Sequence, residues 1–499
     1  MQRSAEVLTI PTITPQELET KNDPKTKKIS CGSTPTTCKK DPYRSFDGIC
    51  NNLKNPSWGA VKEPFSELVN NSYADGVHQF PVTSENEQLP NPRAISLLLF
   101  PSKNIIDYKW NLNTMQWGQI IAHDMSFAGR ITLINNNPVT CCDSEGQLAS
   151  DSDKNPFCAP ILIPENDAVN KEDGRECMKF VRTVSTKDID CTSSKSPSFP
   201  INEVTSYLDL SLTYGEDNMA KNKLIYPNAK GYVNDYNPNV KAGVLKESAS
   251  AAFRYFHTLI RGQLRLFKES RFPYQSIRLS DWLNKPSILE KNDGYDGLMI
   301  GLSFQPQDKS DQYFDREITQ YLFKGNKTLG LDLRAIDIQR ARDHGVANYI
   351  DLRSYCGLSI PKDFDDLCDY MSIKNVNALK SIYKRVEDIE LTVGGSLEKH
   401  VHGTLVGPTF LCILLRQFYI TRVGDRYFYE NGEDKEIAFT LDQLETIRKG
   451  SSMARLFCDN GINIKKMQAK AFELVSPWNA IVQCDQLPFV NLTLWKDTQ

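Results

Sequence analysis

Residues 116–127, with the sequence Gln-Trp-Gly-Gln-Ile-Ile-Ala-His-Asp-Met-Ser-Phe, constrain the fold more than any other stretch of this chain. As a helix, this segment places Gln119 and His123 one turn apart on one face and turns Asp124 about 100° away from them. Histidine exchanges protons near neutral pH, whereas a carboxylate is a hard oxygen ligand suited to calcium. The segment therefore predicts one helix that serves two sites, although an isolated His-Asp pair is more often a core histidine beside a surface acid.

A second segment, Thr-Ser-Tyr-Leu-Asp-Leu-Ser, begins at Thr205 and alternates oxygen-bearing side chains with others. In an extended loop, this period of two directs the side chains of Thr205, Asp209 and Ser211 to one side, where the carbonyl of Tyr207 can join them. Together with Asp124, these groups form an oxygen-only set of the kind that binds calcium. The alternative is a half-buried strand with its polar residues outward.

Apolar residues recur at helical spacing from Phe253 to Leu264, and His257 lies within this stripe. Arg254 precedes the histidine by one turn. A histidine in such a stripe is more often part of the core than a ligand, so the segment by itself leaves both interpretations open.

Residues 333–345 form a strongly charged segment that is typical of a helix. Asp337 and Arg340 share one helical face, and Gly345 suits a C-terminal cap. Taken alone, this pattern indicates only a charged helix.

In order along the chain, many segments make the sequence similar to the animal haem peroxidase superfamily of myeloperoxidase, peroxidasin and peroxinectin. The resemblance implies one large, mainly α-helical domain over residues 38–499 with few short strands. Residues 1–37 are polar and rich in Thr and Lys, a composition that predicts a flexible lead-in. The matching segments are residues 43–52, 89–96, 116–124, 205–215, 231–260, 337–345, 407–412 and 424–428.

The same resemblance implies a role for each candidate residue. His123 and Gln119 would lie on the distal side of a b-type haem, and His257 would be the proximal iron ligand. Asp337 would accept the other ring proton of His257, which strengthens its electron donation. The remaining implied roles are haem propionate pairing by Arg254 and Arg340, and calcium binding by Asp124, Thr205, Tyr207, Asp209 and Ser211.

The chain also departs from the family. Family members carry, after the match to 205–215, a segment with a distal arginine and a glutamate that forms a haem ester, but this chain passes by residue 231 into the stretch before the proximal histidine. The aspartate that forms the other ester is replaced by Ala122, so we expect non-covalent haem. Phe256 replaces a glycine, and its ring must fit near the proximal face or turn away. Lys246 is interpreted as an ordinary surface lysine.

Composition indicates an ordinary large protein rather than a nucleic-acid or membrane protein. The chain has 499 residues, 40% hydrophobic residues and a net charge of −3, which gives no electrostatic bias toward nucleic acid or anionic lipid. Its longest apolar runs are far shorter than the roughly 20 residues that span a bilayer. We therefore expect no membrane span.

Thirteen cysteines favour an oxidising, extracellular compartment, although no signal peptide is visible at Met1. The resemblance pairs Cys38 with Cys50, Cys356 with Cys412 and Cys458 with Cys484, and implies a knot among Cys141, Cys142, Cys158, Cys177 and Cys191. The odd count leaves at least one cysteine unpaired. Glycan acceptor sequences begin at Asn70, Asn326 and Asn491.

Two functional classes follow. The first is a secreted haem peroxidase that reduces hydrogen peroxide while oxidising a phenolic, halide or protein-tyrosine donor, with turnover weakened by the missing distal arginine. The second is a catalytically impaired haem and calcium binder with an adhesive role and contacts to the extracellular matrix. An incomplete gene product or splice form is a third explanation of the missing segment.

Overall fold

The structure, a computed structural model, describes residues 37–129, 133–134, 137–152, 154–189, 191–192, 196–209, 231–291 and 293–496. Apart from residue 37, the predicted lead-in lies outside these residues. Ser211 and the junction between residues 215 and 231 also lie outside them, except for Gly231.

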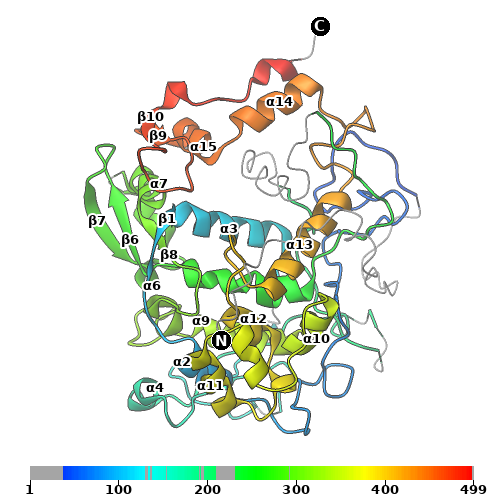
Figure 1. Cartoon of the computed structure of the whole chain (residues 1–499), viewed down its shortest axis with the longest axis vertical. Helices are drawn as coiled ribbons and strands as arrows, with labels where there is room; N and C mark the ends of the chain where they lie inside the picture. Colours follow the sequence, from blue (N-terminus) through cyan, green and yellow to red (C-terminus); the bar gives the residue numbers. More distant parts are fainter. Residues whose placement is uncertain are drawn as a thin grey trace, which may run out of the picture.

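The described chain is mainly α-helical, as the sequence predicts (Figure 1). Its helices are α2 (Pro92–Leu99), α3 (Leu112–Met125), α4 (Ala168–Glu172), α6 (Leu279–Trp282), α7 (Gly294–Phe304), α8 (Arg316–Thr319), α9 (Leu333–Asp343), α10 (Tyr349–Tyr355), α11 (Ile373–Ile382), α12 (Leu391–Leu397), α13 (Pro408–Val423), α14 (Leu441–Gly450) and α15 (Met453–Asn460). Two short irregular helices matter for the site, the π-helical η1 (Ser248–Ala252) and the 3₁₀-helical η2 (Arg254–Leu259).

Strands are few and short, and the described ones form two-stranded antiparallel pairs. The largest pair is a hairpin in which Leu264 faces Ile277. The paired strands are β1 (Ile106–Asn111) with β8 (Pro306–Asp308), β2 (Leu133–Ile134) with β3 (Asn137–Pro138), β4 (Ile161–Leu162) with β5 (Cys177–Met178), β6 (Gln263–Phe267) with β7 (Pro273–Arg278), and β9 (Lys466–Gln468) with β10 (Ile481–Gln483).

Helix α3 crosses the middle of the molecule, with α14 and α15 above it and α9 to α12 below it in the view of Figure 1. It packs against α7 and η2, while η1 packs against α9, α12 and α13. Large apolar clusters join these elements and include Ile338 and Val393, which have no exposed surface. None of the described helices is long and apolar enough to cross a membrane.

Two of the three predicted helices form with small shifts. The helix expected over 116–127 is α3, which ends at Met125 because Ser126 is extended. The charged segment forms α9, and Gly345 follows it with a φ of +56°. An added Cβ there would lie 2.7 Å from the Tyr73 ring, so glycine is required for two reasons.

The third predicted helix is partly wrong. The stripe from Phe253 is helical only to Leu259, and Leu264 lies on strand β6. Ile260 is extended, and Gly262 then donates its N–H to Asp315 Oδ2 at 2.7 Å. A Cβ on Gly262 would lie 2.2 Å from the side chain of Glu317, so this close approach ends the helix and starts the hairpin.

The predicted disulfides Cys38–Cys50, Cys356–Cys412 and Cys458–Cys484 are confirmed. The expected knot contains Cys141–Cys158 and Cys142–Cys177, and Cys191 is also disulfide-bonded. Among the described residues, Cys368 is a free thiol. These bonds fit a protein that folds in an oxidising compartment.

Candidate active site

His257 is held by a buried carboxylate on a different element. Its Nδ1–H donates to Asp337 Oδ2 at 2.7 Å, and Asp337, on α9, has no exposed side-chain surface. Asp337 Oδ1 lies 3.4 Å from Arg254 Nη1. This arrangement fixes the tautomer and orientation of the imidazole and leaves Nε2 as the nitrogen available to a ligand. No described residue forms a hydrogen bond with Nε2, and the side chain is 26% exposed.

The position of Asp337 follows from the way α9 begins. Asp332 caps the helix by accepting the N–H groups of Arg334 and Ala335 at 2.8 and 3.2 Å. The buried Arg93 then bridges Asp332 and Asp167, each at 2.7 Å. Such a cap is worth about 1 kcal/mol, and a charge bound on both sides cannot shift without leaving a buried charge unpaired.

His344, at the other end of α9, joins this helix to η1. Its Nδ1 lies 2.6 Å from Ser250 Oγ, and its Nε2 lies 2.9 Å from Thr183 Oγ1. Burial lowers the pKa of His344 to about 3, so the ring is neutral at neutral pH. The segment η1, just before the helix that carries His257, is therefore held by hydrogen bonds that sequence reasoning missed, because the partners are distant in sequence.

Phe256 is accommodated in an aromatic cluster. Its ring lies edge-on to Phe253 at 5.6 Å between centroids and is tilted against Tyr255 at 6.0 Å. Phe253 in turn meets Phe418 of α13 at 6.4 Å. The bulky replacement of glycine thus adds packing beside His257 and causes no break in η2.

On helix α3, Gln119 and His123 are exposed, as predicted for one face of the helix. On the other side, Ile121 and Met125 are buried in an apolar cluster with Phe65. Neither Gln119 nor His123 has a hydrogen-bond partner among the described residues, because both point away from the core that holds the helix.

The pKa of His123, on helix α3, depends on charged residues of η2. Partial burial lowers its pKa, and the nearby Arg254 and His257 lower it further. Because α3 packs against η2, these three side chains lie close enough to influence one another. His123 is therefore neutral at neutral pH and can accept a proton in the neighbourhood of Arg254 and His257.

These residues fit a haem. A nitrogen of His257 is available, a neutral base, His123, lies close enough to be influenced by its charge, and Arg254 keeps 33% of its side chain exposed, where it can meet an anionic group. Ala122, on α3, offers no carboxylate for an ester.

Arg340, also expected to contact haem, lies in a buried cluster instead of beside Arg254. Its Nη1 donates to Thr183 Oγ1 at 2.7 Å and Asp343 Oδ2 at 2.8 Å, and its guanidinium lies 4.1 Å from the centre of the Phe180 ring. The predicted propionate contact would require an oxygen to approach this cluster, so Arg340 stays a prediction.

The interpretation of Lys246 as a surface lysine is wrong. Its side chain is 1% exposed, and its Nζ donates to Glu67 Oε2 at 2.6 Å and to the carbonyl of Gly345 at 3.0 Å. Lys246 therefore ties the start of η1 to the end of α9, because a buried ammonium needs such partners.

The predicted calcium loop is bent rather than a strand, and it brings only some of its donors together. Thr205 Oγ1 donates to Asp209 Oδ2 at 2.7 Å, so these two side chains do lie on one side. The phenol of the buried Tyr207 bonds to the Trp58 carbonyl, which leaves its own carbonyl as the relevant group. Asp124 is half-buried on α3, and Ser211 lies outside the described residues.

Arg44, which the sequence did not single out, occupies the other side of Asp209. Its guanidinium lies 2.7 Å from Asp209 Oδ1 and 2.6 Å from Asp425 Oδ2, and it stacks over the Tyr207 ring at 4.9 Å. Both oxygens of Asp209 are thus engaged, by Arg44 and Thr205. A calcium ion at this carboxylate would have to share these oxygens with, or displace, Arg44 and Thr205.

Helix α3 is joined to this loop independently of any ion. The Asn202 side chain donates to the carbonyl of Met125 at 2.9 Å and accepts the N–H of Phe127 at 2.8 Å. Asn202 precedes Thr205 by three residues, so the end of the helix that carries His123 and the start of the loop are linked by direct hydrogen bonds.

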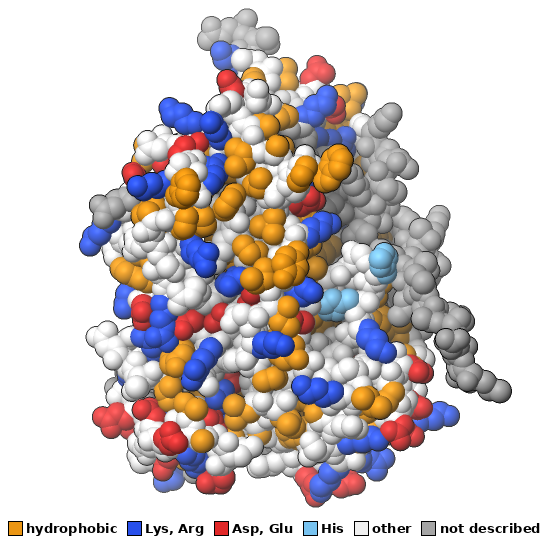
Figure 2. Space-filling view, turned by 60° about the vertical axis from the view of Figure 1, so that its left-hand side comes forward, with side chains coloured by type: hydrophobic (Ala, Val, Ile, Leu, Met, Phe, Trp, Pro, Cys, Tyr) orange, Lys and Arg blue, Asp and Glu red, His pale blue; other side chains and the backbone are white. Residues whose placement is uncertain are grey.

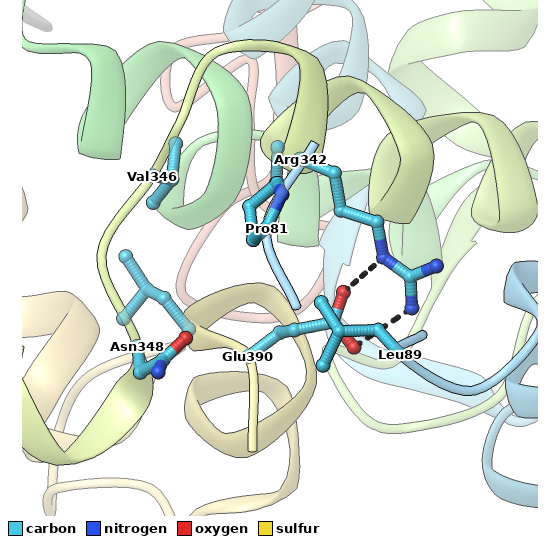
Figure 3. A pocket seen from close by; sticks show the side chains of 8 residues that line it. Pro81, Leu89, Arg342, Val346, Asn348 and Glu390 are labelled. Carbon is cyan, nitrogen blue, oxygen red and sulfur yellow. Dashed lines mark hydrogen bonds and ion pairs between the residues drawn. The ribbon is translucent and has the colours of Figure 1, made fainter. Parts of the chain in front are cut away.

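A separate small pocket at the carboxyl end of α9 carries no candidate chemistry. Figure 3 shows that Pro81, Leu89 and Val346 line it around an ion pair. Arg342 Nε and Nη2 lie 2.6 and 3.0 Å from the two oxygens of Glu390. Because these charges are already paired with each other, we assign no ligand to this pocket.

The face of the molecule in Figure 2 shows no large area of a single charge sign. Acidic and basic side chains are interspersed over the face in Figure 2. This distribution agrees with the small net charge of the chain.

Comparisons with known proteins point to the same family as the sequence resemblance. A family model described as animal haem peroxidase matches residues 43–228 and 216–472. The sequence is 36% identical to a peroxidase of Drosophila melanogaster over 95% of this chain and 86% of that protein. It is 27% identical to the chorion peroxidase of the same organism over 91% of this chain and 71% of that protein.

The alignment with the first relative also reveals missing positions. It extends over 592 positions, whereas 95% of the 499 residues is about 474, so on the order of 100 positions have no counterpart here. Among solved structures, peroxidase A from Dictyostelium discoideum has a TM-score of 0.68 and 22% identity, and covers 87% of this chain and 100% of its own. This likeness shows the fold.

Proposed function

Since this chain belongs to the animal haem peroxidase family and is a peroxidase enzyme, we propose that it binds haem through His257 and uses His123 as the proton acceptor for hydrogen peroxide. The observation that carries the proposal is the hydrogen bond of His257 to the buried Asp337, and the lowered pKa of His123, to which the nearby His257 contributes, supports it. Bound haem would supply an iron that exchanges electrons with peroxide.

The chain's own residues have separate tasks in this proposal. Asp337 accepts the Nδ1 proton of His257, so Nε2 would be the nitrogen that binds the haem iron, with strengthened electron donation. His123 would accept a proton from hydrogen peroxide and donate it to the oxygen that is released as water, while bound haem would supply the electrons that reduce the peroxide. Gln119, one turn away, would orient the peroxide by hydrogen bonding, and Arg254 would pair with a haem propionate.

We further propose that the missing positions fall between residues 215 and 231, where the two ranges matched by the family model also meet. The distal arginine of the family would then be absent. Removal of one such positive group typically slows a reaction by roughly 100- to 1,000-fold, so peroxide turnover should be weak. Haem should be non-covalent because Ala122 cannot form an ester.

Calcium, secretion and the electron donor belong to the same proposal. Thr205 and Asp209 support a calcium site in this loop, with Arg44 as a competing cation. The five described disulfides support folding in a secretory compartment. A small phenol, a halide or a protein tyrosine are the donors that the family resemblance favours.

The missing positions also favour a second candidate, a haem and calcium binder with little turnover and an adhesive role, or an incomplete splice form. Loading the protein with haem and mixing it with peroxide in a stopped-flow instrument separates the candidates. The peroxidase proposal predicts a Soret band, a peroxide reaction that is slow but catalytic in the presence of a phenol, and haem that is extracted by acidic butanone. A Soret band without any reaction would favour the second candidate, and haem retained in acid would contradict non-covalent binding.

A further inference from the structure

A buried tyrosine beside the proposed iron ligand is hydrogen-bonded to a histidine that reaches the surface. Tyr255 lies on η2, two residues before His257, and is 1% exposed. Its phenolic oxygen lies 2.8 Å from His400 Nε2. The two rings are nearly perpendicular, at 86°, with centroids 6.0 Å apart. His400 follows α12 and is only half-buried.

Packing alone does not account for this phenol. The Tyr255 ring packs against Phe410 at 5.7 Å and Phe256 at 6.0 Å, contacts that a phenylalanine would keep. A buried hydroxyl adds a desolvation cost of about 1–3 kcal/mol, which its hydrogen bond must offset.

Other buried tyrosines use different acceptors. Tyr349 and Tyr383 donate to the carboxylates of Glu398 and Glu390, and Tyr73 donates to the backbone carbonyl of Asp343. Tyr255 instead meets an imidazole. Burial lowers the pKa of His400, so this ring is neutral at neutral pH and can accept a proton.

This pairing is suited to one-electron chemistry. A phenol that loses an electron becomes a strong acid, so its oxidation is favourable only where a base takes the proton at once. A neutral imidazole at hydrogen-bonding distance is such a base, and it can later return the same proton. Tyr255 and His257 lie on the same short helix η2 with one residue between them, so the backbone that carries the phenol also carries the proposed iron ligand.

We propose that Tyr255 and His400 form a redox relay between the haem site and the protein surface. Tyr255 gives one electron to an oxidising equivalent generated at the haem and its phenolic proton to His400 Nε2, which leaves a neutral tyrosyl radical and an imidazolium. A donor outside then returns one electron to the radical, and the proton moves back from His400. The donor is oxidised by one electron, and the pair is restored.

The relay identifies a class of donor. Lys399 and His402, on either side of the His400 segment, are exposed, so molecules too large to enter a haem pocket can approach here. We infer that tyrosine side chains of polypeptides are oxidised at this surface, because a phenol can reduce a phenoxyl radical without a large difference in potential. This inference rests on the proposed function, in which His257 binds the iron.

Electron paramagnetic resonance on freeze-quenched samples tests the relay. Haem-loaded protein is mixed with peroxide without a donor, and the variants are Tyr255→Phe, His400→Gly and, as a matched buried tyrosine, Tyr73→Phe. The relay predicts a tyrosyl signal in the natural protein and in Tyr73→Phe, its loss in Tyr255→Phe, and a reduced signal in His400→Gly that added imidazole restores. The ratio of polypeptide to small-phenol oxidation should fall in Tyr255→Phe.

A tyrosyl signal that survives in full in Tyr255→Phe would overturn the relay, as would a natural protein that reacts with peroxide without any tyrosyl signal. A His400→Gly variant with an undiminished signal would contradict the assigned proton acceptor. The Soret band is recorded for every sample. If the natural protein had no Soret band, the haem proposal would be wrong and the relay would be wrong with it. If the band were normal but the tyrosyl signal were unaltered in the variants, only the relay would be wrong.

Discussion

The two sides of the candidate site differ in how firmly the chain holds them. On the proximal side, His257 is bonded to a fully buried carboxylate, and His344 and Lys246 tie the surrounding elements together. On the distal side, Gln119 and His123 are exposed and have no hydrogen-bond partner among the described residues. The orientation of His257, the proposed iron ligand, is therefore fixed by buried contacts between residues distant in sequence, whereas the proposed proton acceptor His123 depends on one helix face.

Replacing the distal base tests whether the two sides are separable and should have the largest effect. In His123→Ala, the rate of reaction with peroxide should fall by roughly 100- to 10,000-fold, because no other described group lies ready to take the proton. The Soret band should remain, since haem binding depends on the proximal side. Stopped-flow mixing measures the rate, and Gln119→Ala should lower it less. An unchanged rate in His123→Ala would contradict the role of His123 as the proton acceptor.

Removing the buried carboxylate of Asp337 should weaken haem binding through His257. In Asp337→Ala, haem should dissociate about 10- to 100-fold faster, because the orientation of His257 is lost and Arg254 loses its partner. Transfer of haem to an apo-globin acceptor measures this rate, and Asp337→Asn should retain part of the affinity. If Asp337→Ala held haem as tightly as the natural protein, the proximal side would not be preorganised in the way described.

Acid should destabilise the proximal side through its buried histidine. The pKa of His344 is about 3 in the folded protein and about 6.5 in an unfolded chain. The unfolded state therefore takes up the proton first, and stability is lost as the pH falls from 6.5 toward 3, by up to a few kcal/mol. Thermal melts of the haem-free protein between pH 7 and pH 4 measure this loss. The slope should be shallower in His344→Gln, and equal slopes would count against the assignment.

The smallest expected effect is a change in calcium affinity at the proposed site near helix α3. Removing the guanidinium in Arg44→Gln should tighten calcium binding by at most about fivefold, because the partly exposed pair with Asp209 is worth about 1 kcal/mol or less. Isothermal titration calorimetry measures the affinity, with Lys62→Gln, an exposed cation 18 residues further along the chain, as the control. Weaker binding in Arg44→Gln would show that the arginine supports the ion rather than competing with it.

Sequence reasoning succeeded where local signals were sufficient. The helices that carry His123 and Asp337 form close to their expected ends, because spacing and a terminal glycine determine them. It failed where contacts between residues distant in sequence determine the structure. The helix after His257 stops at Leu259 because Gly262 packs against residues about 50 positions later.

The same limit applies to charged groups. Lys246 was taken for a surface residue, but its partners Glu67 and Gly345 are separated from it by about 100 residues or more. Arg44 could not be connected with Asp209 for the same reason. A buried ion pair leaves no periodic pattern in the sequence, so only the fold reveals it.

The central claim is that His257 is the iron ligand of a preorganised proximal site. The most direct test is the Soret absorbance of His257→Gly after haem loading, recorded with and without added imidazole, beside the natural protein and His123→Ala. The account predicts that His257→Gly loses the band, that imidazole restores it in part, and that His123→Ala keeps it. Full haem occupancy in His257→Gly without imidazole would contradict the account.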